Sequence, residues 1–289
     1  MNPDEQLSKI RERIDAIDSQ LLELISERAR CAQEVAQVKL GASQSDEAPP
    51  VFYRPEREAQ VLRAIQERNP GPLASEHIAS VFRELMSSCL ALEQPLSVAF
   101  LGPEGTYSQA AALKHFGQSA LPQGQASIHK VFRQVEERIC DYGVVPVENS
   151  TEGMVGQTLD CFLESPLQIT GEIELPVVHH LLAGQGAEQS DIQLILGHEQ
   201  ALGQCRQWLD SHLSDVPREA VASNGEAARR AGIEAGVAAI AGDLAAGLHQ
   251  LDTLASAIQD SSTNTTRFLV LGKESVPPSG HDKTSLLVS

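Results

Sequence analysis

The stretch LSKIRERIDAIDSQLLELISERARCAQEVAQV, residues 7–38, places a core-type residue at every third or fourth position. Alternating steps of three and four form the seam of a helix that packs lengthwise against other helices. Arg28 interrupts this seam, and burying a charge is costly unless the charge is paired. We therefore expect that the seam opens at Arg28 to hold an anion, or that it tolerates a defect there. The seam positions are Leu7, Ile10, Ile14, Ile17, Leu21, Leu24, Arg28, Cys31, Val35 and Val38.

Composition narrows the class of protein. The chain has 289 residues, which predicts one to three domains, and 42% of them are hydrophobic, enough for ordinary cores. A net charge of −17 argues against nucleic acid and anionic membranes as partners. We expect no membrane span, because no apolar run approaches about 18 residues, and the N-terminus does not resemble a signal peptide. Five widely spaced cysteines predict reduced core thiols in a cytoplasmic protein.

The first 95 residues predict an all-helical domain. Pro3 and Asp4 are suitable openers for a helix that continues to about residue 40, roughly 54 Å at 1.5 Å per residue. A loop at 41–52, a helix at 55–68, a break at 69–72 and a third helix at 73–93 follow. So long a helix needs partners to cover its seam, which suggests three helices per chain in an intertwined dimer.

Three cations along the first helix are candidate anion ligands. Arg28 and Lys39 lie about 16 Å apart along the axis, which two long side chains can bridge around a small ligand. Arg11 lies about 25 Å from Arg28, so it would have to serve the site of a partner subunit. The alternative is that these are solvated charges with apolar stems packed along the helix.

Residues 7–40, the pair Arg57-Glu58 and residues 89–93 together resemble the helical chorismate mutase domain, over nearly all of residues 5–94. The resemblance implies that Arg28, Lys39 and the other protomer's Arg11 bind the dianionic substrate chorismate, and that Arg57 and Glu58 complete the site. Such a mutase needs no nucleophile, cofactor or metal. Its pericyclic transition state gathers negative charge on the ether oxygen, so fixed donors aimed at that oxygen are the main catalytic device.

Three positions depart from the family's pattern. Arg54 replaces an aspartate, Cys89 a serine, and Glu93 the glutamine that donates to the ether oxygen. A slip of one residue would instead use Gln94, although the seam places Cys89 inward with Glu93 beside it. A carboxylate cannot donate a hydrogen bond but a carboxylic acid can. We therefore expect Glu93 to work protonated, with a pKa raised above the reference of about 4.3.

Residues 96–273 alternate apolar strand-like runs with helical stretches, which predicts an α/β domain of two halves with largely parallel sheets. A run at 173–182 would cross near the junction of the halves. The expected helices are 127–139, 199–213, 224–235 and 243–251, and the expected strands include 96–101, 194–196, 237–241 and 266–271.

Three turns in this half resemble capping boxes at helix starts, where free N–H groups bind anions. The alternative for each is simple capping. No GxGxxG loop suggests a dinucleotide, no histidine spacing suggests a metal, and the pair His179-His180 predicts one core and one surface histidine. The turns are Thr106-Tyr-Ser-Gln109, Asn149-Ser-Thr-Glu152 and Ser223-Asn-Gly-Glu226, and their candidate ligands are Thr106, Ser108, Ser223 and Asn224.

Five motifs in order resemble prephenate dehydratase across residues 97–272. They are Gly102-Pro-Glu-Gly-Thr-Tyr-Ser108, Val147-Glu-Asn-Ser-Thr-Glu-Gly153, His198-Glu-Gln-Ala-Leu202, Ser223-Asn-Gly-Glu-Ala-Ala228 and Asn264-Thr-Thr-Arg-Phe268. The resemblance implies two periplasmic-binding-protein-like lobes around a cleft, in which prephenate loses CO₂ and water to give phenylpyruvate. Glu199 stands where the family usually has proline, which should alter that turn without removing Gln200.

The family's residues carry over by motif. Thr266 matches the essential threonine, which assists departure of the ring hydroxyl. Glu148, Asn149 and Gln200 match further site positions. On physical grounds, Ser150, Thr151 and Arg267 are candidate carboxylate ligands, and Phe268 is expected to shape the cleft.

The two halves form one biosynthetic unit on the phenylalanine branch, because the mutase product is the dehydratase substrate. We expect a mutase domain at 1–95, a dehydratase domain at 96–273, and a linker at 274–289 ending in the first strand of a regulatory ACT domain. One strand cannot make a phenylalanine pocket, so we expect no feedback inhibition in this chain. The alternatives are a two-lobed anion receptor fused to a helical dimeriser, and a mutase fused to a dehydrogenase.

Overall fold

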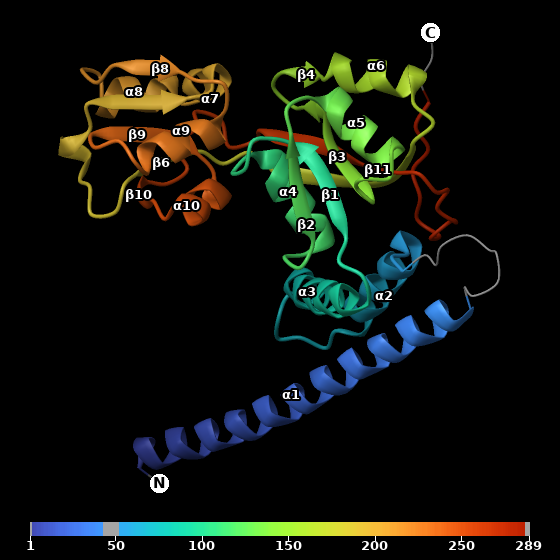
Figure 1. The fold of residues 1–289 in the computed structure, drawn as a ribbon. Coiled ribbons are helices and arrows are strands. Elements are labelled where there is room, and N and C mark those ends of the chain that lie inside the picture. Colours follow the sequence, from blue (N-terminus) through green and yellow to red (C-terminus); the bar gives the residue numbers. More distant parts are fainter. Residues whose placement is uncertain (1, 43–51, 287–289) are drawn as a thin grey trace. The chain divides into compact units, whose positions relative to one another are not determined.

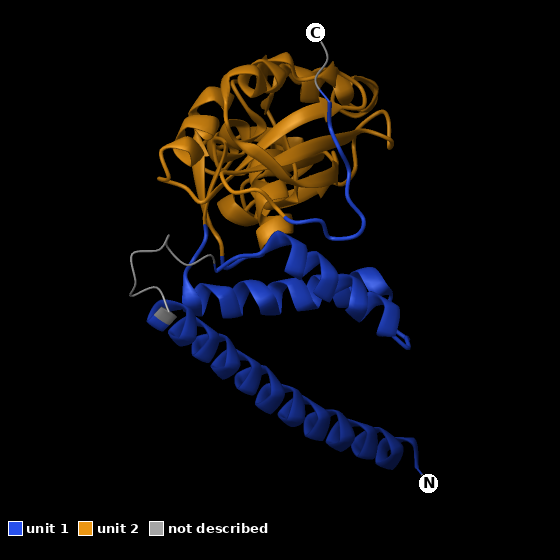
Figure 2. Ribbon diagram, turned by 90° about the vertical axis from the view of Figure 1, so that its right-hand side faces the viewer, with its two compact units in different colours: residues 1–96, 117–119, 277–289 blue, residues 97–116, 120–276 orange. Residues whose placement is uncertain are grey.

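The structure, a computed structural model, describes residues 2–42 and 52–286. It divides into two compact units (Figure 2). The first contains residues 1–96, 117–119 and 277–289, and the second contains residues 97–116 and 120–276. No helix in the described part of the chain is long and apolar enough to cross a bilayer.

The first unit has three helices, as predicted: α1 (Pro3–Ala42), α2 (Pro55–Arg68) and α3 (Ser75–Glu93). Acidic side chains occupy the first turn of α1 and Lys39 its last turn, which suits the helix dipole. Both α1 and α2 pack against α3. The only buried hydrophobic side chain of α1 among the described residues is Ala36, in its C-terminal part.

The predicted seam of α1 is exposed over most of its length within a single chain. Its hydrophobic members from Leu7 to Leu24 are each 45–62% exposed. Cys31 is exposed as well, so the expectation of a core thiol fails for this cysteine, whereas Cys89, Cys140, Cys161 and Cys205 are buried as predicted. From Leu7 to Leu24, about 26 Å of helix therefore carries an apolar stripe that its own chain does not cover.

The second unit contains two lobes, each a sheet with helices on its faces (Figure 1). The first lobe contains residues 97–176, and its sheet also includes β11, a strand that follows the second lobe in the chain. Its sheet runs in the order β2-β1-β3-β11-β5, with β4 paired to β3. Its elements are β1 (Ser97–Leu101), α4 (Tyr107–Phe116), β2 (Leu121–Gln125), α5 (Ile128–Glu136), β3 (Tyr142–Asn149), β4 (Gly153–Met154), α6 (Gly156–Glu164), β5 (Gln168–Pro176) and β11 (Thr265–Gly272).

The second lobe spans residues 180–255, with the sheet order β10-β6-β9-β7-β8. The single helix expected at 199–213 is two shorter helices that meet at Cys205. The elements are β6 (His180–Ala183), β7 (Leu194–Gly197), α7 (Glu199–Gln204), α8 (Arg206–His212), β8 (Arg218–Ala220), α9 (Asn224–Ala231), β9 (Val237–Ala241), α10 (Asp243–His249) and β10 (Asp252–Ala255), with a 3₁₀ turn at Gln189–Asp191.

Both sheets are mixed, so the prediction of largely parallel sheets was wrong. In the first lobe β2, β1 and β3 are parallel while β11 is antiparallel to both neighbours, and in the second β8, β7 and β9 are parallel while β6 is antiparallel to both of its neighbours. Both antiparallel strands arrive from the other lobe, β6 after the segment 177–179 and β11 after the segment 256–264. A crossing chain enters its new sheet from the opposite end, and local sequence pattern does not record that direction. We call 177–179 and 256–264 the crossover segments.

The C-terminal stretch differs from expectation. The part of the predicted ACT strand that the structure describes, residues 283–286, is not a strand, and residues 287–289 lie outside the described chain. The nearer part of this stretch folds locally, since the Asp282 carboxylate accepts hydrogen bonds from the backbone and side chain of Ser279.

Candidate functional sites

The first candidate site lies where the last turn of α1 approaches the end of α3. The Lys39 Nζ atom is 4.0 Å from the Glu93 Oε2 atom and 3.3 Å from the backbone oxygen of Phe52, and it stands 5.1 Å from the centre of the Phe52 ring. Arg28 is half-buried on α1 and close enough to act on the charge of Glu93. Three predicted catalytic side chains, Arg28, Lys39 and Glu93, therefore belong to one electrostatic cluster.

Glu93 is a largely buried carboxyl group with a raised pKa. Its side chain is 10% exposed, and its Oε2 atom accepts no hydrogen bond among the described residues. Burial raises the pKa of Glu93, while the positive charges of Lys39 and Arg28 act in the opposite direction. Gln94 is exposed, so the alternative register that would use Gln94 is disfavoured.

Glu58, on α2, is a second acidic group of this unit whose pKa is shifted. The Glu58 Oε1 atom is 3.9 Å from Arg83 Nε, and Glu58 also accepts a hydrogen bond from Tyr53. Burial raises the pKa of Glu58, and both contacts oppose that rise. Two other predicted binding residues of this unit differ in exposure. Arg57 is exposed to solvent, whereas Cys89 is buried, at 4% exposed.

Arg11 is not part of this cluster. It is exposed on α1, 17 positions before Arg28, which is about 25 Å along a straight helix. No side chain spans that distance, so a single chain leaves Arg11 without a role in the site around Arg28.

The second candidate site centres on Thr266 and Asn149, which lie opposite each other on β11 and β3. Asn149 Nδ2 donates to Thr266 Oγ1 at 2.8 Å and to Asn264 Oδ1 at 2.8 Å. Asn149 Oδ1 in turn accepts from the backbone N–H groups of Thr151 and Glu152. Because Thr266 accepts from Asn149, its own hydroxyl proton remains available to a further acceptor.

Sequence reasoning missed further members of this site. Asn264 Nδ2 donates to Gln204 Oε1 at 3.1 Å. The same Gln204 oxygen lies 2.9 Å from His179 Nε2. The other ring nitrogen, His179 Nδ1, lies 2.9 Å from the Tyr107 hydroxyl. Gln200, the predicted glutamine, is exposed on the first turn of α7 and its site role stays a prediction, whereas Gln204 is linked to Thr266 through Asn264 and Asn149. Both glutamines are in the same short helix, and the spacing alone did not separate them.

Glu148 and Arg267 form a different cluster. Arg267 pairs with Glu148 at 2.9 Å and with Glu172 at 3.3 Å, so two carboxylates already neutralise its guanidinium. Successive side chains of a strand point to opposite faces, and β11 pairs with β5 in regular register from Thr265 to Val270. Thr266 and Arg267 therefore point to opposite faces of the sheet, and the role of Arg267 as a carboxylate ligand stays a prediction.

Several predicted ligands are occupied by the fold itself. Phe268 and Ser108 are buried, at 1% and 6% exposed. Ser150 Oγ accepts from Thr265 N and so ties the 149–151 turn to β11. Asn224 Oδ1 accepts from His198 N at 2.8 Å.

The three predicted capping boxes have three different outcomes. Ser223 Oγ accepts from Glu226 N and caps α9, as predicted. Thr106 donates to backbone carbonyls instead, and it is Gln109 Oε1 that accepts, from Gly105 N. The turn after Asn149 starts no helix at all, because residues 150–152 lead into β4.

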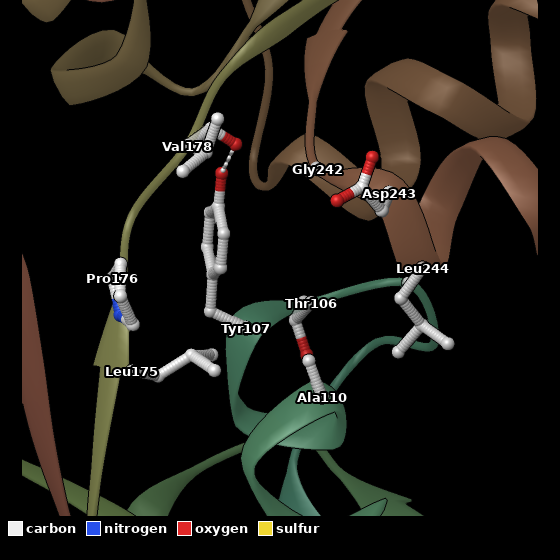
Figure 3. A pocket seen from close by; sticks show the side chains of 10 residues that line it. Thr106, Tyr107, Ala110, Leu175, Pro176, Val178, Gly242, Asp243 and Leu244 are labelled. Atoms are coloured by element: carbon white, nitrogen blue, oxygen red, sulfur yellow. Dashed lines mark hydrogen bonds between the residues drawn. The ribbon is translucent and has the colours of Figure 1, made fainter. Parts of the chain in front are cut away.

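A cavity of about 120 Å³ lies between the two lobes, beside the N-terminal ends of α4 and α10 (Figure 3). The Tyr107 ring forms one wall and donates a hydrogen bond to the backbone oxygen of Val178 at 2.6 Å. The lining residues are Gly105, Thr106, Tyr107, Ala110, Leu175, Pro176, Val178, Gly242, Asp243 and Leu244.

The two histidines that follow β5 are both buried, 2% and 7% exposed, so the expectation of one surface histidine was wrong. His180 Nδ1 accepts from Ala257 N, and its Nε2 atom lies 3.1 Å from Asp243 Oδ1. Across residues 2–42 and 52–286, no group of three His, Cys, Asp or Glu side chains is arranged to hold a metal ion.

Residues 98–276 match the prephenate dehydratase family, and residues 10–94 match chorismate mutase type II. The bifunctional chorismate mutase/prephenate dehydratase of Pseudomonas aeruginosa is 56% identical over 289 residues, which cover 100% of this chain and 79% of that protein. The chain belongs to the family of bifunctional chorismate mutase/prephenate dehydratases.

A second member of this bifunctional family and one solved structure agree with that assignment. The Neisseria gonorrhoeae protein of the same description is 48% identical, over 99% of this chain and 77% of its own length. The structure of prephenate dehydratase from Arthrobacter aurescens in complex with L-Phe is 32% identical with a TM-score of 0.59, over 65% of this chain and 62% of that one. A helical mutase part followed by an α/β dehydratase part is therefore confirmed, and the intertwined dimer stays a prediction.

Proposed function

We propose that this chain is a bifunctional enzyme of phenylalanine biosynthesis, which rearranges chorismate to prephenate and then decarboxylates and dehydrates prephenate to phenylpyruvate. The match to bifunctional relatives along the whole of this chain, with a family model matched in each half, is the observation that carries the proposal. We assign the first reaction to residues 1–95 and the second to residues 96–273.

The mutase reaction uses Arg28, Lys39 and Glu93. Arg28 binds a substrate carboxylate, and Lys39 and protonated Glu93 donate to the ether oxygen, where negative charge grows as the C–O bond breaks. The clustering of these three groups and the raised pKa of Glu93 support this assignment. The dianionic substrate would raise that pKa further, because nearby negative charge disfavours the carboxylate.

Two copies of the chain make the complete mutase site. The exposed seam of α1 supports a homodimer in which each long helix covers the other. The partner subunit's Arg11 then supplies the second carboxylate ligand, with Arg57, Glu58 and Cys89 as further contributors to the site. A dimer of this kind would bury the apolar stripe and also place Arg11 of each subunit near Arg28 of the other.

The dehydratase reaction uses Thr266 and Asn149. Asn149 donates to Thr266 Oγ1, so the threonine proton points to another acceptor, which we assign as the departing ring hydroxyl of prephenate. The C–C bond to the ring carboxylate breaks, CO₂ leaves, its electron pair aromatises the ring, and the C–O bond breaks with release of water. Thr266 orients or relays the proton, since a threonine hydroxyl is a very weak acid.

The wider setting follows from composition. The free cysteines support a reducing compartment, so we place both reactions in the cytoplasm. The net charge of −17 argues against nucleic-acid and anionic-membrane partners.

One assay tests the proposal: chorismate is supplied and phenylpyruvate is followed by its ultraviolet absorbance. Arg28→Ala should abolish formation of prephenate but leave conversion of added prephenate intact. Thr266→Ala should do the reverse and let prephenate accumulate. Failure of the wild-type chain to convert either substrate would overturn the proposal.

A further inference from the structure

A chain of hydrogen bonds runs from Thr266 through both crossover segments, and it deepens the dehydratase function proposed above, on which it rests. Two of its six side chains are buried, Asn264 at 6% and His179 at 2% exposed, and the other four are half-buried. Its members in order are Thr266, Asn149, Asn264, Gln204, His179 and Tyr107.

The direction of donation is set at Asn149. Its Oδ1 atom accepts from two backbone N–H groups, at 3.0 and 3.1 Å, and backbone N–H groups can only donate. The amide of Asn149 therefore cannot be reversed, and both of its N–H bonds point outward. One serves Thr266 Oγ1 and the other serves Asn264 Oδ1.

The same direction continues to His179. With its Oδ1 accepting, Asn264 must donate through Nδ2, and the acceptor is Gln204 Oε1 at 3.1 Å. Gln204 Oε1 is thus an acceptor for its second neighbour as well, His179 Nε2 at 2.9 Å. His179 Nε2 must therefore carry a hydrogen, whatever the charge of the ring.

The other ring nitrogen completes the assignment. Burial lowers the pKa of His179, and the neighbouring His180 acts in the same direction, while the bond to Gln204 opposes them. In the neutral ring with its hydrogen on Nε2, the Nδ1 atom can only accept. The single hydrogen of the Tyr107 hydroxyl is then shared between Nδ1 at 2.9 Å and the backbone oxygen of Val178 at 2.6 Å.

The hydrogen-bond chain connects the two lobes through both crossover segments. Thr266, Asn149 and Tyr107 belong to the first lobe, and Gln204 ends α7 of the second. His179 lies in the first crossover segment and Asn264 in the second. A relative movement of the lobes would change distances in this chain, so lobe orientation and the donor arrangement at Thr266 are linked.

We propose that His179 is a positioning residue for the dehydratase step. Its Nε2–H holds Gln204, and through Asn264 it keeps Asn149 aimed at Thr266, so that the threonine proton is directed at the substrate. Without this donor, the Gln204 amide can rotate and present N–H groups to Asn264. A reversed Asn264 would then set its NH₂ group against that of Asn149 and displace the partner of Thr266.

A matched set of substitutions in the full chain tests this. A glutamine side chain can place an amide N–H where His179 has Nε2, an asparagine can replace only Nδ1, and a leucine replaces neither. We expect kcat for added prephenate to fall about 10- to 100-fold in His179→Leu and His179→Asn with little change in KM, the size of effect expected for a misplaced catalytic group. His179→Gln should recover kcat to within about threefold of wild type.

Two controls separate positioning from simple loss of structure. His180→Leu removes the adjacent buried imidazole, which lies outside the hydrogen-bond chain and accepts from Ala257 N, and should leave kcat within about twofold even if the melting temperature falls. Mutase activity of the same preparations reports the amount of active chain. Unchanged kcat in His179→Leu, or equal recovery by asparagine and glutamine, would overturn the inference.

Nitrogen-15 NMR of the wild-type histidines adds a test that needs no variant. His179 should show a hydrogen on Nε2, and a neutral ring with its hydrogen only on Nδ1 would overturn the proposal. If the wild-type chain makes no phenylpyruvate, the proposed function fails as a whole. If wild type and Thr266→Ala behave as expected and only the His179 series deviates, this inference alone fails.

Discussion

Replacing Glu93 by glutamine should change the pH dependence of the mutase reaction more than its rate at low pH. Glu93 is 10% exposed beside Lys39, and burial raises the pKa of its carboxyl group. The neutral acid can donate to the ether oxygen and the carboxylate cannot. Wild-type kcat/KM should therefore be high below this raised pKa and fall about tenfold per pH unit above it, while Glu93→Gln stays flat.

The size of the effect follows from the number of pH units beyond the pKa. Between two pH values that both lie above it and differ by two units, wild-type kcat/KM should fall about 100-fold and the variant should stay within about twofold. The assay is loss of chorismate absorbance from pH 5 to 9 in buffers of constant ionic strength. Prephenate conversion by the same chain serves as the control, because Glu93 lies in the other unit.

Thermal unfolding gives an independent measurement with the same sign. A carboxyl group whose pKa is raised by folding favours the folded state below its unfolded pKa, and this contribution disappears as pH rises through the folded pKa. Each unit of increase corresponds to about 1.4 kcal/mol. Glu93→Gln should thus match wild type near pH 4 and be the more stable protein at pH 8. A flat wild-type activity profile that is identical in the variant would refute the role assigned to Glu93.

Three further predictions concern assembly and packing. Co-refolding equal amounts of the mutase-inactive variants Arg11→Ala and Arg28→Ala should restore about one quarter of wild-type mutase activity. Half of the dimers are then mixed, and each mixed dimer has one intact site. No recovery in verified mixed dimers would exclude donation of Arg11 across the interface. Gly225→Ala should lower the melting temperature and the dehydratase rate but not mutase activity. A Cβ atom there would stand 2.2 Å from the backbone oxygen of Glu104, and overpacking typically costs about 1–3 kcal/mol. Calorimetry showing an unchanged transition would contradict this. Ser223→Ala should cost about 1 kcal/mol in urea unfolding through loss of the α9 cap, with Ser223→Asp retaining most of the stability.

The helical half was largely predictable because its signals are local. The seam from Leu7 to Val38, the break after Arg68 and the end of α3 at Glu93 were all readable from spacing and from Pro and Gly positions. The structure then placed Lys39 beside Glu93, although 54 positions separate them, and left Gln94 exposed. The seam spacing had indicated Glu93, and burial decided between the two.

The α/β half was predictable in its order of elements but not in its strand directions. Periodicity located β9 and β11 to within a residue. It did not show that β6 and β11 run against their neighbours, because direction depends on which lobe the chain has just left. The regular register of β11 with β5 then assigned Thr266 and Arg267 to opposite faces, which separated two residues that the motif had grouped together.

The family, the helical seam interrupted by Arg28 and the motif that contains Thr266 were all readable from the amino-acid sequence, because each depends on residues close together in the chain. The folded structure was needed to show that Gln204 is linked to Thr266 through Asn264 and Asn149, and that His179 lies beside Gln204. Those hydrogen bonds join residues from 25 to 117 positions apart. No spacing in a linear sequence encodes such partners, because packing of the two lobes around their crossover segments brings them together.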